Sequence, residues 1–460
     1  MKKFFKTWAA MAGVVGVQAF FTSVHGQSSA LPDSVVQQRL EEIDQRQRIF
    51  ERRLEIEKEE AAAKAKDAPT FSAGKDGFSL RSADSKFQLK LRAYAQTDGR
   101  FFLGDDEKRL TNAFLQRRIR PIFEGTLDKN FDFYVMIDFA AGATVLQDAY
   151  VDFRYWPQAR LRIGKLKQPF GLERLQSGAN LLFVERGFPT GLVPNRDIGV
   201  QLHGELAKGA ITYAVGAFNG VADGASTDND TGDEKDYVAR FFLVPFKNSS
   251  TAALQWLGFG VAVSTGTQIG TAAAPALSTY RTPAQQTFFS YRTDGTAAGT
   301  AIANGKRTRI SPQGHFYAGP LGVLGEYVIS EQAVTRGATT SKLKNKALQA
   351  AASFVLTGQK QTFRGVTLSK PFDPQARSWG ALELAARYNK LEVDEDAFPL
   401  FADATRSAQT ATAIAVGINW YLNRNAKLSV DYEITDFEGG ASTGDRAKEK
   451  IIFSRLQLSY

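Results

Sequence analysis

The amino-acid sequence predicts an all-β fold: a 16-stranded antiparallel transmembrane β-barrel with an inward-folded constriction loop, preceded by a short N-terminal coiled-coil helix. Three observations support this prediction. About sixteen segments alternate apolar and polar side chains with the two-residue period of a strand. Short and long connections alternate between these segments, as they do in membrane barrels. The amino terminus carries a signal for export.

The export signal comes first along the chain. Lys2, Lys3 and Lys6 precede the apolar stretch "TWAAMAGVVGVQAFF", which is too short to span a bilayer and is followed by small residues. This pattern is typical of a secretory signal peptide, predicted here over residues 1–26. The sequence contains no cysteine. An exported chain of this length must therefore be stabilised by its own core or by a membrane, because disulfides are excluded.

Residues 33–66 show a heptad pattern, in which apolar positions are spaced alternately by four and three residues. We expect a short coiled coil in the periplasm. A lone amphipathic helix is the alternative, because the pattern degrades at Gln47 and Glu57. Pro69 and the turn-forming "SAGKDG" end the helix and predict a linker over residues 67–86. The heptad positions are Val36, Leu40, Ile43, Gln47, Phe50, Leu54, Glu57 and Ala61.

Residues 87–460 form the predicted barrel. In "FQLKLRAYAQ", which begins at Phe87, one face of the strand is apolar and the other mainly polar. No comparable helical pattern interrupts the segments of this kind, which favours an all-β fold. The strands are predicted to start near Phe87, Phe114, Phe131, Val145, Arg160, Ile198, Ala210, Tyr237, Gln255, Arg307, Leu321, Lys346, Ala381, Thr410, Ala426 and Lys450.

The connections distinguish a barrel from a sandwich. Tight turns such as "LDKN", "WPQA" and "LNRN" follow even-numbered strands, and long loops such as "VADGASTDNDTGDEKD" follow odd-numbered strands. Two connections break the pattern, a short "AGAT" and the long residues 357–379. A soluble sandwich gives no reason for this alternation. A closed barrel in an outer membrane does, because closure pairs every backbone polar group in lipid, and sixteen strands leave a water-filled lumen.

Positive charge recurs on the predicted lumen face. In "RRIRPIFEG", Arg118 and Arg120 fall on the lumen wall, whereas Arg117 falls on the lipid side near the extracellular rim. The opposite phase would put two arginines in lipid, where each costs about 2 to 4 kcal/mol at mid-depth. The other lumen-facing cations are predicted to be Lys90, Arg92, Arg160, Arg162, Arg240, Arg307, Arg309, Arg387 and Arg455.

These cations indicate a path for anions. The formal net charge is +9, and the excess of Lys and Arg lies in residues 70–460. Guanidinium groups offer paired donors to oxyanions, and cations that line a narrow bore concentrate anions. The alternative is structural, because the arginines also face predicted lumen carboxylates. These are Asp132, Asp138, Asp148, Asp152 and Glu205.

The segment "GKLKQPFGLERLQSGANLLFVERGFPTGLVPNRD", residues 164–197, joins the fifth and sixth predicted strands and is too apolar for a solvated loop. We expect it to fold into the barrel and narrow the pore. Packing at a subunit interface is the alternative. Inward folding would bring five cations to the constriction: Lys165, Lys167, Arg174, Arg186 and Arg196.

Residues from about 80 to 460 resemble the phosphate-selective porin O and P family. The resemblance rests on "RRIRPIFEGTLDKNFDFYVMIDF", "LQDAYVDFRYWPQARLRIGKLKQPFGLE", "LLFVERGFP", "NRDIGVQL", "LTGQKQTFRGVTLSKPFD", "WGALELAARYNKL" and "VGINWYLNRNAKLSVDYEITDF". It implies a trimeric sixteen-stranded barrel of the outer membrane in which an arginine ladder leads anions to a lysine-bearing constriction. By this resemblance the anion-binding residues are Arg118, Arg120, Arg160 and Arg162 in the ladder and Lys165 and Lys167 at the constriction.

The leading hypothesis is therefore an outer-membrane porin with a water-filled, anion-selective channel for diffusion of phosphate or similar small anions, without cofactor or metal. Its expected partners are these anions, outer-membrane lipid and two further copies of the chain; the coiled coil could also contact peptidoglycan. The alternatives are a general diffusion porin, or a structural protein that tethers the envelope without phosphate specificity. Nucleic acid is an unexpected partner for an exported protein.

An outer-membrane enzyme such as a lipase is the hypothesis of another class. It requires a base paired with a nucleophile, and after removal of the signal peptide, with His25, only His203 and His315 remain. No serine motif accompanies them, and two histidines are few for a metal site. The sequence therefore argues against an enzyme.

Overall fold

The computed structural model describes residues 32–74, 77–104, 110–230 and 232–460. The predicted signal peptide, residues 1–26, and His25 within it lie outside the described residues. The chain divides into two compact units, one ending at Lys66 and one beginning at Asp67, and each is described by itself.

The first unit contains helix α1 (Asp33–Asp67). Its first turn begins after Pro32, whose carbonyl accepts the Val35 N–H at 2.8 Å, and it ends just before Pro69, which cannot continue a helix. The predicted heptad residues Leu40, Ile43 and Phe50 are exposed along the isolated helix. No helix in the described ranges is long and apolar enough to cross a bilayer.

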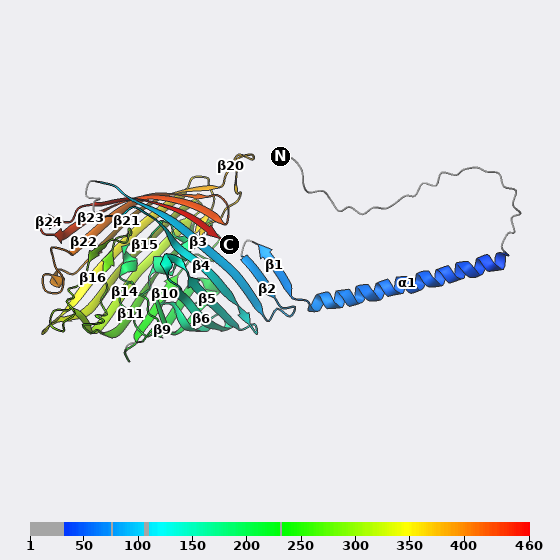
Figure 1. Ribbon diagram of the computed structural model, residues 1–460, viewed down its shortest axis with the longest axis horizontal. Coiled ribbons are helices and arrows are strands. Elements are labelled where there is room, and N and C mark those ends of the chain that lie inside the picture. Colours follow the sequence, from blue (N-terminus) through cyan, green and yellow to red (C-terminus); the bar gives the residue numbers. More distant parts are fainter. Residues whose placement is uncertain (1–31, 75–76, 105–109, 231) are drawn as a thin grey trace. The chain divides into compact units, whose positions relative to one another are not determined.

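The second unit is a closed β-barrel (Figure 1). Its sheet has nineteen strands in the described residues, of which β1, β2 and β24 are short additions, and the other sixteen form the ring. Neighbouring strands are antiparallel, and the last strand pairs with the first, so the ring has no free edge. The ring consists of β3 (Gln88–Phe102), β4 (Ala113–Leu127), β5 (Phe131–Asp138), β6 (Val145–Trp156), β7 (Ala159–Lys167), β8 (Arg196–Leu206), β9 (Ile211–Phe218), β10 (Asp236–Leu243), β11 (Trp256–Ile269), β14 (Ile302–Ala318), β15 (Leu321–Arg336), β16 (Thr339–Val355), β21 (Ala381–Glu392), β22 (Ala408–Tyr421), β23 (Ala426–Ala441) and β25 (Glu449–Ser459).

All sixteen predicted strand starts fall in or next to these strands, so the predicted fold is confirmed. The remaining elements are short and lie in the connections or before the ring. They are β1 (Thr70–Gly74), β2 (Gly77–Arg81), α2 (Leu172–Leu175), β12 (Tyr280–Arg281), β13 (Thr287–Phe289), β17 (Gln361–Thr362), β18 (Gly365–Val366), β19 (Phe372–Asp373), β20 (Ser378–Trp379) and β24 (Gly444–Asp445), with 3-10 turns at Ala140–Gly142, Gly178–Asn180, Phe188–Gly191, Ala207–Gly209, Ala252–Leu254 and Glu395–Ala397.

Residues 67–86, which the sequence analysis treats as a linker, contain a hairpin. Strand β2 pairs with the first part of β3, with Phe78 opposite Leu91, and β1 pairs with β2. The ring of Phe78 also contacts the ring of Tyr460 at 5.7 Å between centroids. The sheet therefore begins before the predicted barrel boundary at residue 87.

Side chains alternate across the barrel wall as a membrane requires. Along β16 the lumen-facing residues from Leu343 to Val355 are buried, whereas outward residues such as Leu348 and Phe354 are exposed. The outer face is an apolar band that suits lipid. Exposed residues of this band include Leu161, Ile163, Val200, Leu202, Ile414, Val416, Ile418, Val430, Leu456 and Leu458.

The main core lies inside the barrel. Residues 168–195, here called the constriction loop, connect β7 to β8, and Phe170, Leu192 and Val193 of this loop are fully buried. They belong to one cluster with wall residues that include Val328 and Leu343. The apolar character that predicted inward folding is thus satisfied by the lumen wall.

Candidate functional site

The constriction loop is fastened across the lumen by hydrogen bonds from its backbone. The Glu326 carboxylate on β15 accepts the Leu172 N–H at 2.7 Å, and Asp431 on β23 accepts the Val184 N–H at 2.6 Å. Carboxylates that accept backbone N–H groups make strong, oriented bonds. The loop is therefore held against the β15–β23 side of the wall, and its polar side chains face the remaining lumen.

Two side chains of the loop, Arg174 and Arg186, form a cation cluster with Lys167 at the end of β7. The Lys167 ammonium donates to the Gln176 carbonyl at 2.8 Å, and Arg186 donates to the same carbonyl at 2.8 Å. Arg174 donates to the Thr190 carbonyl at 2.5 Å. Within the described residues, none of the three has a carboxylate within 4.0 Å. Carboxylates such as Glu173 act on Arg174 and Arg186 only from a greater distance.

Electrostatics confirms that the cluster is short of negative charge. Burial lowers the pKa of Arg174 to about 9, and the nearby charges of Arg186 and Arg196 add to this effect. Burial likewise lowers the pKa of Arg186 to about 10. Both residues are half-buried and line a cavity of the lumen. An anion that enters the lumen here would relieve the repulsion among these cations.

A second group of arginines surrounds Glu185 of the constriction loop. Its carboxylate accepts from Arg117 at 2.5 Å and from Arg100 at 2.9 Å, and Arg118 lies at 3.7 Å. Burial alone would raise the pKa of Glu185, but Arg117 and Arg118 lower it below its usual range. The single negative charge of Glu185 therefore compensates at least three guanidinium groups.

The predicted position of Arg117 on the lipid side is wrong. Gln96 of β3 faces Arg118, and the next residue, Thr97, faces Gln116, so Arg117 is the extra residue of a β-bulge. An extra residue inverts the alternation of side chains. Arg117 therefore turns inward to Glu185, and Gln116, which was expected on the lumen wall, is exposed and accepts a hydrogen bond from Thr97 at 2.9 Å.

The four residues proposed as a ladder do line the lumen wall, but most are paired with carboxylates. Arg120 bonds Asp138 at 2.7 Å, and Arg160 and Arg162 both bond Asp152, at 3.0 Å and 2.6 Å. Arg118 donates to the amide oxygen of Gln96 at 2.7 Å besides its contact with Glu185.

The two predicted constriction lysines have different surroundings. The Lys165 ammonium donates to the Leu146 carbonyl at 2.7 Å and forms an ion pair with Asp228, whereas Lys167 belongs to the cation cluster. Both lysines follow Gly164, which has a φ of +131° within β7. A Cβ there would lie 2.2 Å from the Ala149 carbonyl oxygen, so only glycine fits.

A cavity of about 550 Å³ is lined by Arg174 and Arg186 of the cluster, and Lys167 lies behind them, outside its lining. At roughly 30 Å³ for each water molecule, it can hold a small hydrated anion. Two of its arginines, Arg117 and Arg281, were not predicted to face the lumen. The loop that bears Arg281, residues 270–301, lacks a strand pattern that could have placed it. The cavity is lined in part by Arg117, Arg118, Arg174, Arg186, Arg281, Glu185 and Asp223.

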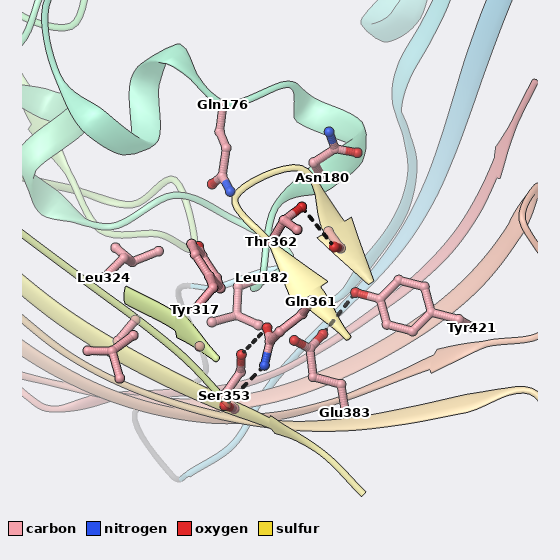
Figure 2. A pocket seen from close by; sticks show the side chains of 14 residues that line it. Gln176, Asn180, Leu182, Tyr317, Leu324, Ser353, Gln361, Thr362, Glu383 and Tyr421 are labelled. Carbon is pink, nitrogen blue, oxygen red and sulfur yellow. Dashed lines mark hydrogen bonds between the residues drawn. The ribbon is translucent and has the colours of Figure 1, made fainter. Parts of the chain in front are cut away.

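A second cavity of about 290 Å³ contains the paired arginines Arg160 and Arg162 together with Arg154, Asp132 and Asp152. A third cavity of about 190 Å³ lies between Asn180 of the constriction loop, Arg364 and the wall residue Lys427. Figure 2 shows the β17–β18 hairpin beside the wall strands that carry Ser353 and Glu383, and the space between them measures only about 20 Å³. The two larger of these lumen cavities therefore lie beside the arginine-bearing strands.

A closed sixteen-stranded barrel with an apolar outer band, a loop across its lumen and an open, cation-lined passage beside that loop defines an outer-membrane porin. The chain belongs to the phosphate-selective porin O and P family, whose model matches residues 87–460. The resemblance inferred from the sequence motifs is thus confirmed.

Individual proteins agree with this assignment. Porin O of Pseudomonas aeruginosa is 24% identical over 394 residues, which cover 78% of this chain and 85% of that protein. The outer membrane channel DcaP of Acinetobacter baumannii has a similar structure, with a TM-score of 0.56, 10% identity, and coverage of 85% of this chain and 100% of that chain. The anion-selective porin from Comamonas acidovorans matches with a TM-score of 0.50, 10% identity, and coverage of 81% and 100%. The two structural likenesses show the fold.

Proposed function

We propose that the protein is an anion-selective channel through which phosphate or similar small anions diffuse across the outer membrane. The observation that carries this proposal is the cation cluster. Three positive charges lie beside the constriction loop with only carbonyl oxygens as acceptors. A deep site of low dielectric that holds unpaired cations attracts anions and repels cations.

The surroundings of the cluster support passage as well as attraction. The arginines around Glu185 line the larger cavity, so an anion meets partly neutralised guanidinium groups before it reaches the cluster. The paired arginines Arg160 and Arg162 lie in the other cavity. Weak sites in series suit conduction, because binding must be strong enough for entry and weak enough for release. We propose that Arg118, Arg120, Arg160, Arg162 and Lys165 contribute such weaker sites and that Lys167 contributes the strongest.

A general diffusion porin is the second candidate. The observation that favours it is the large number of ion pairs in the lumen, such as Arg120 with Asp138 and Arg455 with Asp98 at 2.6 Å. Paired charges contribute little net selectivity. The family and the barrel indicate a channel rather than an enzyme. His203 contacts Asp152 at 3.1 Å, and His315 is stacked between aromatic rings.

Bilayer electrophysiology tests the proposal. The protein is inserted into planar bilayers under a KCl gradient, and the reversal potential gives the ratio of anion to cation permeability. Phosphate is then titrated at constant chloride. We expect a chloride preference and a block of the chloride current by phosphate. A preference for potassium would exclude anion selectivity, and a chloride preference without phosphate block would favour the general porin.

We further propose that α1 lies in the periplasm and holds three copies of the chain together. Contact with peptidoglycan is the alternative role. Support comes from the apolar residues of its heptad pattern, which are exposed on the isolated helix and are expected to be buried in a coiled coil. Deletion of residues 33–66 separates the roles. Loss of the trimer would indicate assembly, and intact trimers with a weakened cell envelope would indicate tethering.

A further inference from the structure

The connection between β16 and β21, residues 356–380, differs from the others at its end of the barrel. The two connections beside it are tight turns, residues 319–320 and residues 422–425. This one contains the β17–β18 hairpin, here called the inner hairpin and comprising residues 360–367, which lies against the lumen wall (Figure 2). Long connections are normally found at the opposite, extracellular end of such barrels. Its presence therefore requires an explanation.

The inner hairpin is anchored to the wall by Gln361, which is 5% exposed. The Gln361 amide donates to the Pro320 carbonyl at 2.5 Å and accepts from the Ser353 hydroxyl at 2.8 Å. Its backbone N–H donates to the Gly319 carbonyl at 3.0 Å. A buried amide with several well-formed hydrogen bonds holds one position. The hairpin is thus a packed part of the barrel.

The inner hairpin also touches the constriction loop. The Gln176 amide of the loop donates to the Phe363 carbonyl at 2.8 Å, and the Phe363 ring stacks on His315 of β14 at 5.3 Å between centroids. The cavity of about 20 Å³ that remains between loop, hairpin and wall has room for only one or two water molecules. Loop and hairpin together therefore close this side of the lumen at the level of Gln361 and Glu383, and the cavity of about 190 Å³ between Asn180, Arg364 and the wall lies next to the closed region.

The closed side is the acidic side of the wall. Glu383, which lines the small cavity with Gln361, is 2% exposed and accepts from the Tyr421 hydroxyl at 2.8 Å. Glu326 and Asp431, further along the same wall, are buried under the constriction loop. The cation cluster lies on the other side of that loop. If ions reached both sides, the carboxylates would attract cations and offset the effect of the cluster.

We propose that the inner hairpin sets the selectivity of the channel by excluding ions from the acidic side of the lumen, so that a barrel of mixed charge conducts through its cationic side alone. This inference rests on the proposed anion selectivity. Glu383 is the carboxylate that the hairpin itself screens, and the constriction loop screens the others. Gln361 and Phe363 are the residues that position the hairpin.

A deletion tests the proposal. Residues 361–366 are removed and Lys360 is joined to Thr367, whose N–H already donates to the Lys360 carbonyl at 2.8 Å, so the flanking chain needs little movement. We expect a higher single-channel conductance, because a second path opens. We also expect the ratio of anion to cation permeability to fall by roughly threefold or more, the change in local ion concentration that corresponds to about 1 kT of potential.

Two controls separate screening from other effects. The deletion also removes the charge of Arg364, so Arg364→Gln is made in the intact chain, where we expect the parent conductance and nearly the parent permeability ratio. Glu383→Gln is then added to the deletion variant. It should restore most of the anion preference while the conductance stays high, because the second path remains open and has lost its negative charge.

Two results would overturn the proposal: an inserted deletion variant with the parent conductance and permeability ratio, or a deletion variant whose lowered ratio is unaffected by Glu383→Gln. If the deletion variant does not assemble, Gln361→Ala is used. It should show transient openings of larger conductance and lower anion preference, and uniform parent-level currents would count against the inference. The reversal potential of the parent alone decides the proposed function, so the two failures are distinguishable.

Discussion

Replacement of Lys167 by glutamine is the sharpest test of the cation cluster. The ammonium of Lys167 contacts carbonyl oxygens only, at 2.8 Å and 3.5 Å, and glutamine keeps a side chain that can donate to these oxygens. The substitution therefore removes one positive charge with little change in packing. We expect Lys167→Gln to weaken the phosphate block of the chloride current.

The magnitude follows from Coulomb's law. An anion bound among three cations sits several ångströms from each, and two unit charges about 8 Å apart interact by roughly 2 kcal/mol at an effective dielectric constant of about 20. Since about 1.4 kcal/mol corresponds to a factor of ten, the half-blocking phosphate concentration should rise about thirtyfold.

Lys165→Gln is the matched control, because it makes the same chemical change two residues away. Its ammonium is already paired with Asp228, so the net charge available to an anion is small, and a clearly smaller shift is expected. Both variants are measured in planar bilayers at one ionic strength. The reasoning would be refuted if the half-blocking concentrations of Lys167→Gln and the parent agreed within about twofold, or if Lys165→Gln had the larger effect.

Three further predictions concern stability and screening. Glu185→Gln should lower the free energy of unfolding by about 3 to 5 kcal/mol, because it leaves several buried guanidinium groups without their carboxylate, and heat-dependent gel mobility of detergent-solubilised protein measures the loss. The pKa of Glu185 is lowered in the folded protein. Its ionised carboxylate therefore stabilises the fold fully above the ordinary carboxyl pKa range, and this stabilisation declines as the pH falls below that range. Because Glu185→Gln lacks the carboxylate, the variant should lose less stability than the parent on acidification. Leu192→Ala, at a fully buried site under the constriction loop, should cost about 2 to 5 kcal/mol and increase open-channel noise; unchanged thermal stability would argue against tight packing of the loop. Raising KCl from 0.1 M to 1 M shortens the screening length from about 10 Å to about 3 Å, so the anion preference should decrease but persist, and its complete loss would place the selecting charges at exposed positions instead.

The strands could be predicted because lipid and water impose a two-residue period on each of them. The constriction loop could be predicted because Phe170, Leu192 and their neighbours need burial. The bulge at Arg117 could not, since one extra residue leaves the local sequence looking regular. It shows only in the pairing of Gln96 and Thr97 with the neighbouring strand.

The lumen arginines pair with carboxylates that are distant in the chain. The sequence therefore did not decide which arginines are paired. Lys165 and Lys167 look equivalent because they share a motif and a spacing of two. Their partners make them different in the structure, since Lys165 meets Asp228 and Lys167 meets carbonyl oxygens of the constriction loop. The length of residues 357–379 was visible as an exception to the alternation of connections, but their direction into the lumen depends on Gln361 and its partners, which no local pattern reveals.

The seam of the barrel has a consequence for biogenesis. Arg455 on the last strand donates two hydrogen bonds to Asp98 on the first, at 2.6 Å and 2.7 Å, and Glu185 lies within 3.9 Å of Arg455 and 2.9 Å of Arg100. The carboxylate that docks the constriction loop therefore finds its full set of partners only after the two ends of the sheet have joined. A nascent barrel still open at this seam lacks Arg455, one of the four guanidinium groups around Glu185. Seating of the constriction loop is thus completed only when the sheet closes.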